Sequence, residues 1–221
     1  MVDNIKKTAL YDFHKANSNN VIDFSGFHLP VFYSSIIEEH QSVRKDAGLF
    51  DVSHMGQILI SGNSSKKFVQ MVTTNDASKL KKGQAQYSAI CNEDGGIIDD
   101  ILVYKRESDY MLVINASDID TKFKWLKSFQ IKETKIENRS KEFSMIALQG
   151  PKSRKIIQNI IKDDISKIRF YEFVQNIECL GHNILLSRTG YTGELGFEIY
   201  CSHNAVIDIW DHILDNFKEH G

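Results

Sequence analysis

The chain has 221 residues, of which 42% are hydrophobic and 25% are charged. This is ordinary globular composition, and the length allows a sizeable core in one or two domains. The formal net charge is −2, which argues against a protein that binds nucleic acid by neutralising many phosphates. The sequence also lacks a run of about eighteen apolar residues, so we expect no membrane-spanning segment.

The N-terminus and the cysteines bear on the cellular compartment. Residues 1–7 are short and polar, without the apolar core of a signal peptide or the Arg-rich character of a transit peptide. We therefore expect a cytoplasmic protein of bacterial type, or a mitochondrial matrix protein if the source is eukaryotic and a leader has been removed. The cysteines Cys91, Cys179 and Cys201 are far apart, which favours reduced thiols over a disulfide framework or a metal site.

Helical periodicity occurs in five stretches of the chain. The first runs from about residue 34 to 47, with Ile36, Ile37, Val43 and Ala47 on one side. Three more begin near Ser64, near Ser117 or Asp118, and at Pro151, and a last one lies near the C-terminal end. Their apolar residues are Phe68, Val69, Val72; Ile119, Phe123, Leu126; Ile156, Ile157, Ile160, Ile161; and Val206, Trp210, Ile213, Leu214, Phe217.

Strand-like runs alternate with these helices. They are residues 57–61, 87–91, 97–105, 110–115, 144–148, 183–187 and 196–201. The turn sequence Asp94-Gly95-Gly96 predicts that two of these strands form a hairpin. Adjacent strands mixed with scattered helices indicate an α+β fold with antiparallel sheets, in which residues 53–142 could form a unit of their own.

Two neighbouring acids interrupt the apolar strand 97–105. Because successive side chains of a strand point to opposite faces, Asp99 shares a face with Ile101, and Asp100 shares the other with Leu102. A carboxylate beside buried apolar surface must be paired or used, so one of them is a candidate for catalysis or cation binding. Alternatively, the strand begins at Asp100 and both acids are solvated near the turn.

Two further segments contain candidate polar groups. Residues 50–56 place Ser53 next to His54, but members of a catalytic triad usually lie far apart in sequence, so a structural histidine is the simpler interpretation. Met55 either lines a pocket or fills core. Residues 188–199 hold three glycines in a loop whose backbone could approach a ligand, followed by Glu198 on a strand. This loop lacks the Gly-Lys-Ser/Thr ending of a phosphate loop.

Several motifs in chain order resemble the T-protein of the glycine cleavage system. They are Thr8–His14, Phe24–Tyr33, His40–Arg44, Gly48–Gly56, the Asp99-Asp100 strand, Ala147–Pro151 and Thr189–Glu194. Each motif is weak by itself, but together they span nearly the whole chain. The family transfers the methylene of an aminomethyl group, held on the lipoyl arm of H-protein, to tetrahydrofolate and releases ammonia. The resemblance thus implies tetrahydrofolate as co-substrate and lipoylated H-protein as partner.

The resemblance also implies roles for individual residues. By its motif, Asp99 matches the catalytic aspartate of the family, which leaves a structural role for Asp100. Glu198 matches the residue that accepts the paired donors of the pterin edge. The remaining matches are to residues that border or stack on the folate, namely Met55, Tyr87, Asn115 and Tyr191. No metal ligands are implied.

The resemblance further predicts the domain organisation. A first folate-binding subdomain comprises residues 1–52 with 146–221, and an inserted α+β subdomain comprises residues 53–145. Family members continue with an arginine-bearing segment and a C-terminal β domain, which are missing from this sequence. We therefore expect the 221-residue chain to bind folate weakly and to turn over little. Calorimetric titration with tetrahydrofolate tests this, and micromolar or tighter binding would contradict it.

Three other functions remain open on the sequence. A folate-binding relative that maintains iron–sulfur proteins would carry a cysteine near the glycine-rich loop, whereas this loop reads Thr189-Gly190-Tyr191. A demethylase of the same fold would act on a small methylated sulfur or nitrogen compound. A non-catalytic fragment would bind folate, or dock on H-protein, without transfer. Ammonia release from aminomethylated H-protein, and a pull-down with that protein, distinguish these cases.

Overall fold

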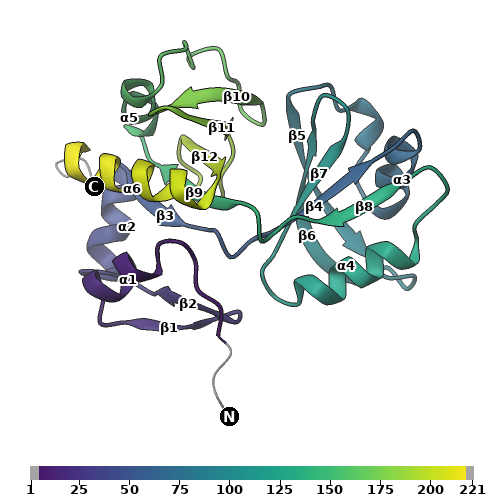
Figure 1. Cartoon of the computed structure of the whole chain (residues 1–221), viewed down its shortest axis with the longest axis horizontal. Helices are drawn as coiled ribbons and strands as arrows, with labels where there is room; N and C mark the ends of the chain where they lie inside the picture. Colours follow the sequence, from purple (N-terminus) through teal and green to yellow (C-terminus); the bar gives the residue numbers. More distant parts are fainter. Residues whose placement is uncertain (1–4, 218–221) are drawn as a thin grey trace. The chain divides into compact units, whose positions relative to one another are not determined.

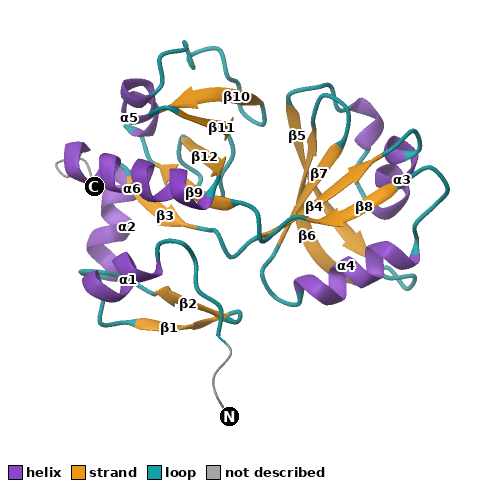
Figure 2. Cartoon of the chain, viewed as in Figure 1, coloured by secondary structure: helices purple, strands orange, loops and turns teal. Residues whose placement is uncertain are grey.

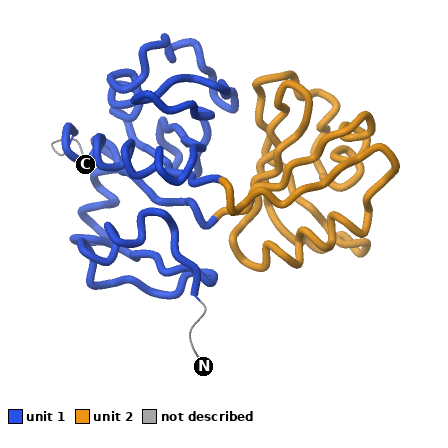
Figure 3. The backbone as a smooth tube through the Cα atoms, in the orientation of Figure 1, with its two compact units in different colours: residues 1–54, 143–221 blue, residues 55–142 orange. Residues whose placement is uncertain are grey.

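The computed structural model describes residues 5–217, which form the α+β architecture with antiparallel sheets that the sequence predicts (Figures 1 and 2). Backbone contacts divide the chain into two compact units (Figure 3). Unit 1 comprises residues 1–54 and 143–221, and unit 2 comprises residues 55–142. The sequence places the breaks at 52/53 and 145/146. Within the described range, each helix is too short or too polar to cross a lipid bilayer.

Unit 1 is built on a five-stranded antiparallel sheet in the order β10-β11-β12-β9-β3. Its strands are β3 (Gly48–Asp51), β9 (Ser144–Gln149), β10 (Phe173–Cys179), β11 (His182–Ser187) and β12 (Gly196–Cys201). A separate hairpin joins β1 (Val21–Phe24) to β2 (Phe27–Pro30). The helices of this unit are α1 (Tyr11–Asn17), α2 (Ile36–Lys45), α5 (Ser153–Ile160) and α6 (His203–Phe217).

The core of unit 1 lies around its two central strands. Every residue of β9 and of β12 is buried, as expected for strands that have neighbours on both sides. The apolar faces of α5 and α6 contribute Ile156, Ile157, Val206, Ile209 and Trp210 to the same core. Burying one such side chain stabilises the fold by about 1.5–3 kcal/mol, which is why these short amphipathic segments form helices here.

Unit 2 contains a second antiparallel sheet, in the order β5-β6-β7-β4-β8. Its strands are β4 (Gly56–Ser61), β5 (Gln84–Cys91), β6 (Ile97–Lys105), β7 (Tyr110–Ile114) and β8 (Lys135–Asn138). The helices α3 (Ser65–Val72) and α4 (Ile119–Ser128) and a 3-10 turn, η1 (Ala77–Lys79), complete the unit. Residues of both helices form one core with inward-facing residues of the sheet, such as Ile58, Ile101 and Leu112.

The structure confirms the longer predicted elements and differs at several short ones. The β5–β6 hairpin forms as predicted, with Gly95 at φ 83° in its turn. The helix predicted for 34–47 is observed as α2. Its Val43 is buried, but Ile36 and Ile37 are exposed. The sequence pattern did not predict α1 or four of the described strands, which are short, polar or irregular; the strands are β1, β2, β3 and β8. It also missed β10, which contains a bulge near Gln175.

Candidate functional site

The two acids of β6 lie on opposite faces of the unit 2 sheet. Asp99 is 6% exposed and alternates with Ile101 and Val103, which belong to the core beneath the helices. Asp100 is exposed, so it lies on the open face. The predicted alternation is therefore correct, and the strand begins at Ile97, before both acids.

Asp99 is paired entirely within unit 2. Its Oδ2 lies 2.9 Å from Nζ of Lys122, a residue of α4, and also accepts the backbone N–H of Asn115 at 2.9 Å. Its Oδ1 accepts a hydrogen bond from Nδ2 of Asn115 at 2.9 Å. A buried carboxylate with a cation and two N–H donors has its charge compensated by the protein itself. This arrangement favours an internal role for Asp99.

Asp100 presents its carboxylate among residues of the open face. The phenol of Tyr87 donates to Oδ2 at 3.2 Å, and Nδ2 of Asn115 donates to Oδ1 at 2.9 Å. Tyr87 itself is 55% exposed, although it is a large aromatic residue in the middle of β5. The structure therefore brings Tyr87, Asn115 and Asp100 together, with one aromatic ring, one amide and one carboxylate available on the same side of the sheet.

Met55 lies at the end of the sheet where Asn115 follows β7. The next residue, Gly56, pairs with Ile114, so Met55 and Asn115 come from neighbouring strand ends. The carbonyl of Met55 accepts a hydrogen bond from Nε2 of Gln57 at 2.9 Å, and the residue is half-buried. From this position Met55 could either border a site on the open face or pack in the interior.

In unit 1, Glu198 is a buried carboxylate of the central strand β12. It is 4% exposed, and its Oε2 accepts hydrogen bonds from the Thr189 hydroxyl and, at 3.4 Å, from the Tyr200 phenol. Burial, and then the negative charge of Glu198, raise the pKa of Tyr171. Tyr171 adopts a left-handed backbone conformation with φ 62°, which is uncommon for a residue of this size.

Tyr191 lies in the glycine-rich loop that precedes β12, and its side chain is 82% exposed. Gln149, which is almost fully buried, holds this loop from beneath: its Nε2 donates to the Thr189 carbonyl, and its Oε1 accepts from the Thr192 hydroxyl at 2.9 Å. Arg44 donates to the Thr192 carbonyl at 2.6 Å. The loop is therefore a built platform that presents an aromatic ring.

Gly190 and Gly196 permit the close approach of this loop to Gln149. A Cβ atom added at Gly190 would lie 2.1 Å from Oε1 of Gln149, and one added at Gly196 would lie 2.2 Å from it. Both distances are far below a normal van der Waals contact. Gly190 also has φ 152°, in the region that favours glycine. Glycine is therefore needed at these two positions of the loop, because the buried side-chain amide of Gln149 leaves no room for a Cβ atom.

Two other features lie outside these groups of residues. His54 is half-buried, and burial is the main reason that its pKa is lowered; its Nδ1 has no hydrogen-bond partner among the described residues.

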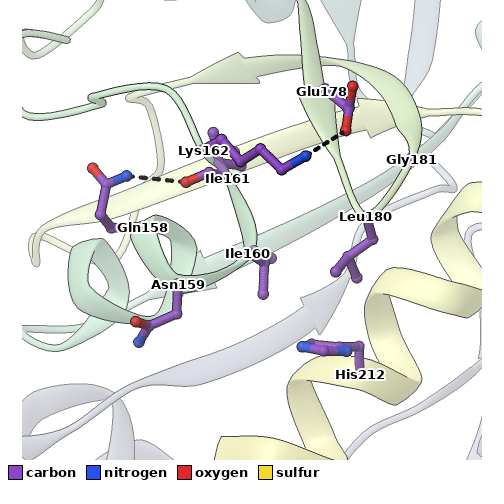
Figure 4. A pocket seen from close by; sticks show the side chains of 9 residues that line it. All are labelled: Gln158, Asn159, Ile160, Ile161, Lys162, Glu178, Leu180, Gly181 and His212. Carbon is purple, nitrogen blue, oxygen red and sulfur yellow. Dashed lines mark hydrogen bonds and ion pairs between the residues drawn. The ribbon is translucent and has the colours of Figure 1, made fainter.

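A surface hollow of about 570 Å³ lies in unit 1, and Figure 4 shows the residues that line it, including Lys162, Glu178 and His212. The ion pair across it, at 3.7 Å, joins two exposed side chains, so its polar lining is solvated.

The predicted site residues thus form two groups, one in each unit. Tyr87, Asn115 and Met55 lie in unit 2, and Tyr191 and Glu198 lie in unit 1. Sequence reasoning assigned no ligand contact to Asp100, although β-strand alternation places it with Leu102, the residue that pairs with Tyr87. It missed Lys122, Gln149 and Tyr171, whose partners are distant in sequence. Among residues 5–217, His, Cys, Asp and Glu form no cluster able to hold a metal ion.

Comparisons with known proteins agree with the fold. The crystal structure of glycine cleavage system aminomethyltransferase T from Bartonella henselae superposes with a TM-score of 0.86 at 28% identity, covering 96% of this chain and 58% of that one. Heterotetrameric sarcosine oxidase from Corynebacterium sp. U-96 in complex with pyrrole 2-carboxylate shares the fold, with a TM-score of 0.63 at 12% identity over 97% of this chain and 96% of the other.

The fold places the chain in the class of α+β proteins that includes this T-protein aminomethyltransferase. The chain belongs to the GCVT N-terminal domain family, whose model matches residues 10–221. The aminomethyltransferase of Bacillus cytotoxicus is 49% identical over 216 residues, or 97% of this chain and 59% of its own length. That of Thermoanaerobacter pseudethanolicus is 46% identical over 222 residues. The chain thus spans about three-fifths of the length of these relatives.

Proposed function

We propose that this chain provides catalytic and folate-binding residues of a tetrahydrofolate-dependent aminomethyltransferase of glycine cleavage. The observation that supports this most strongly is the family match over residues 10–221, together with relatives near 47% identity that are named aminomethyltransferases. In this reaction, the methylene of an aminomethyl group on the lipoyl arm of H-protein passes to tetrahydrofolate, and ammonia leaves.

The geometry supports Asp100, rather than Asp99, as the carboxylate that faces the reacting groups. A carboxylate stabilises the positive charge that develops when the aminomethyl group loses ammonia, provided that its own charge is not already compensated. Lys122 already neutralises Asp99 at 2.9 Å, and the site is buried. Asp100 lies on the open face with Tyr87 and Asn115, which hold its two oxygens in place. Asp99 then serves as an internal anchor.

The residues of unit 1 suit the pterin end of a reduced folate. The amino-pyrimidinone edge presents two parallel donors, which a carboxylate such as Glu198 accepts well. Aromatic side chains pack well on a flat ring system, and both Tyr171 and Tyr191 are near enough to Glu198 that, in addition to desolvation, its negative charge raises their pKa values. We propose that Met55, Tyr87 and Asn115 are the residues of unit 2 that border the folate.

The proposed partner is lipoylated H-protein, which would deliver the aminomethyl group on its lipoyl arm. The named relatives are bacterial aminomethyltransferases, which supports the cytoplasmic location expected from the sequence. The formal net charge of −2 makes no case for nucleic acid as a further partner.

The function is tested by mixing the chain with aminomethylated H-protein and tetrahydrofolate and measuring both ammonia and methylenetetrahydrofolate. Stoichiometric formation of both products above the uncatalysed rate supports the proposal. Binding of H-protein in a pull-down without either product would replace it with a docking role. Demethylation of a small methylated sulfur or nitrogen compound, in the absence of transfer from H-protein, would indicate a demethylase instead.

A further inference from the structure

Lys122 is a buried lysine that the proposed reaction does not use. Its side chain is 6% exposed, whereas lysine is almost never fully buried unless it is paired. Its Nζ lies 2.9 Å from Oδ2 of Asp99, 3.1 Å from the Asn115 carbonyl and 3.4 Å from Oγ of Ser117. The ammonium therefore joins the start of α4 to the buried side of β6.

Asn115, which directly follows the central strand β7, continues this network to the open face. Its Nδ2 lies 2.9 Å from Oδ1 of Asp99, 3.1 Å from the Asp100 carbonyl and 2.9 Å from Oδ1 of Asp100. All three neighbours are acceptors, which fixes the amide with its nitrogen toward the acids. One unbroken path of polar contacts thus runs from Lys122 through Asp99 and Asn115 to Asp100.

We propose that the Lys122–Asp99 pair positions Asp100, by clamping the Asn115 amide that holds the Asp100 carboxylate. A buried ion pair adds little net stability compared with well-packed apolar residues, so its presence suggests a geometric role. Asp99 accepts hydrogen bonds from the backbone N–H and the side-chain Nδ2 of Asn115, and Lys122 fixes Asp99 while donating to the Asn115 carbonyl. The link from this geometry to turnover rests on the proposed function, but the clamp itself does not.

A variant that replaces the pair with apolar side chains separates positioning from stability. Asp99→Leu/Lys122→Met removes both charges together, so that no unpaired charge is left in the buried region. The matched control is Lys124→Met, which removes an exposed lysine from the same helix. The first readout is hydrogen exchange of the Asn115 side-chain amide in ¹⁵N-labelled protein, compared at equal folded fraction. The second is the rate of methylene transfer from aminomethylated H-protein to tetrahydrofolate.

The double variant should exchange the Asn115 amide hydrogens roughly tenfold faster or more, because their buried acceptor is gone. Its kcat should fall by a similar factor, since a misplaced catalytic group costs rate, while KM for H-protein stays unchanged. Lys124→Met should match the wild type in the exchange rate of the Asn115 amide, in kcat and in KM for H-protein. Wild-type exchange of Asn115 in the folded double variant would overturn the proposal, and so would faster exchange with unchanged kcat.

Two further outcomes are informative. If the double variant does not fold, Lys122→Gln takes its place, because it keeps a donor for Asp99 but no charge; unchanged Asn115 exchange there would also overturn the clamp. If the wild type and Lys124→Met both fail to transfer methylene, the proposed function fails. In that case the exchange rates of Asn115 still decide whether Lys122 and Asp99 hold it.

Discussion

Substitution of Gly196 by alanine tests the account of the glycine-rich loop. The new Cβ would lie 2.2 Å from both Cδ and Oε1 of Gln149, more than an ångström inside normal contact. Gln149 cannot move without losing its hydrogen bonds to the Thr189 carbonyl and the Thr192 hydroxyl. Overpacking typically costs about 1–3 kcal/mol, and a buried amide left unsatisfied costs about 1–3 kcal/mol more. We therefore expect a loss of about 2–6 kcal/mol in the free energy of unfolding.

Urea denaturation measures this loss, and a double-mutant cycle identifies its cause. In the Gln149→Ala background the side chain that collides with the new methyl group is absent. Gly196→Ala should therefore cost at least about 1 kcal/mol less there than in the wild type. Gly26→Ala is a useful control, because a Cβ atom at that position meets nothing within 4 Å, and its cost reflects only φ 80°. Equal costs of Gly196→Ala in both backgrounds would refute the reasoning.

Two other predictions concern ionisation. Burial alone would raise the pKa of Asp51, but hydrogen bonds, that from His14 foremost, lower it overall. Asp51 therefore stabilises the fold above its unfolded pKa of about 3.9, and this contribution is lost as pH falls through the lower folded pKa. In Asp51→Asn, the free energy of unfolding should depend less steeply on pH below about pH 4 than in the wild type. An unchanged pH dependence in that range would count against this prediction. Burial raises the pKa of Cys179 and Cys201 to about 12, so iodoacetamide at pH 8 should alkylate half-buried Cys91 first; modification of all three at equal rates in the native protein would contradict this.

The sequence predicted those features that depend on local periodicity. The alternation along β6 follows from the pattern of apolar residues, and it correctly separates Asp99 from Asp100. Gly95 marked its hairpin because glycine readily adopts the positive φ that the turn requires. Glu198 lies on a strand, as expected; that strand has neighbours on both sides, and Glu198 is 4% exposed.

Features that depend on tertiary contacts could not be read from the sequence. Which of the two acids is paired depends on Lys122, which comes from a helix 23 residues further along the chain than Asp99. Nothing in the sequence around Gln149 indicates that it lies beneath a loop 40 residues away. Ile37 was expected on the same apolar helix face as Val43, but Val43 is buried whereas Ile37 is exposed. In the first two cases the missing information is the identity of a distant partner.

The central claim is that Asp100 faces the reacting groups while Asp99 is held inside the protein. The direct test compares single-turnover methylene transfer in Asp100→Asn, Asp99→Asn and the wild type, with the melting temperature of each. We predict that Asp100→Asn lowers the rate about a hundredfold or more without lowering the melting temperature, because it removes a charge on an exposed face. Asp99→Asn should lower the melting temperature by leaving Lys122 unpaired. A wild-type rate in Asp100→Asn, with a stable but inactive Asp99→Asn, would contradict the account.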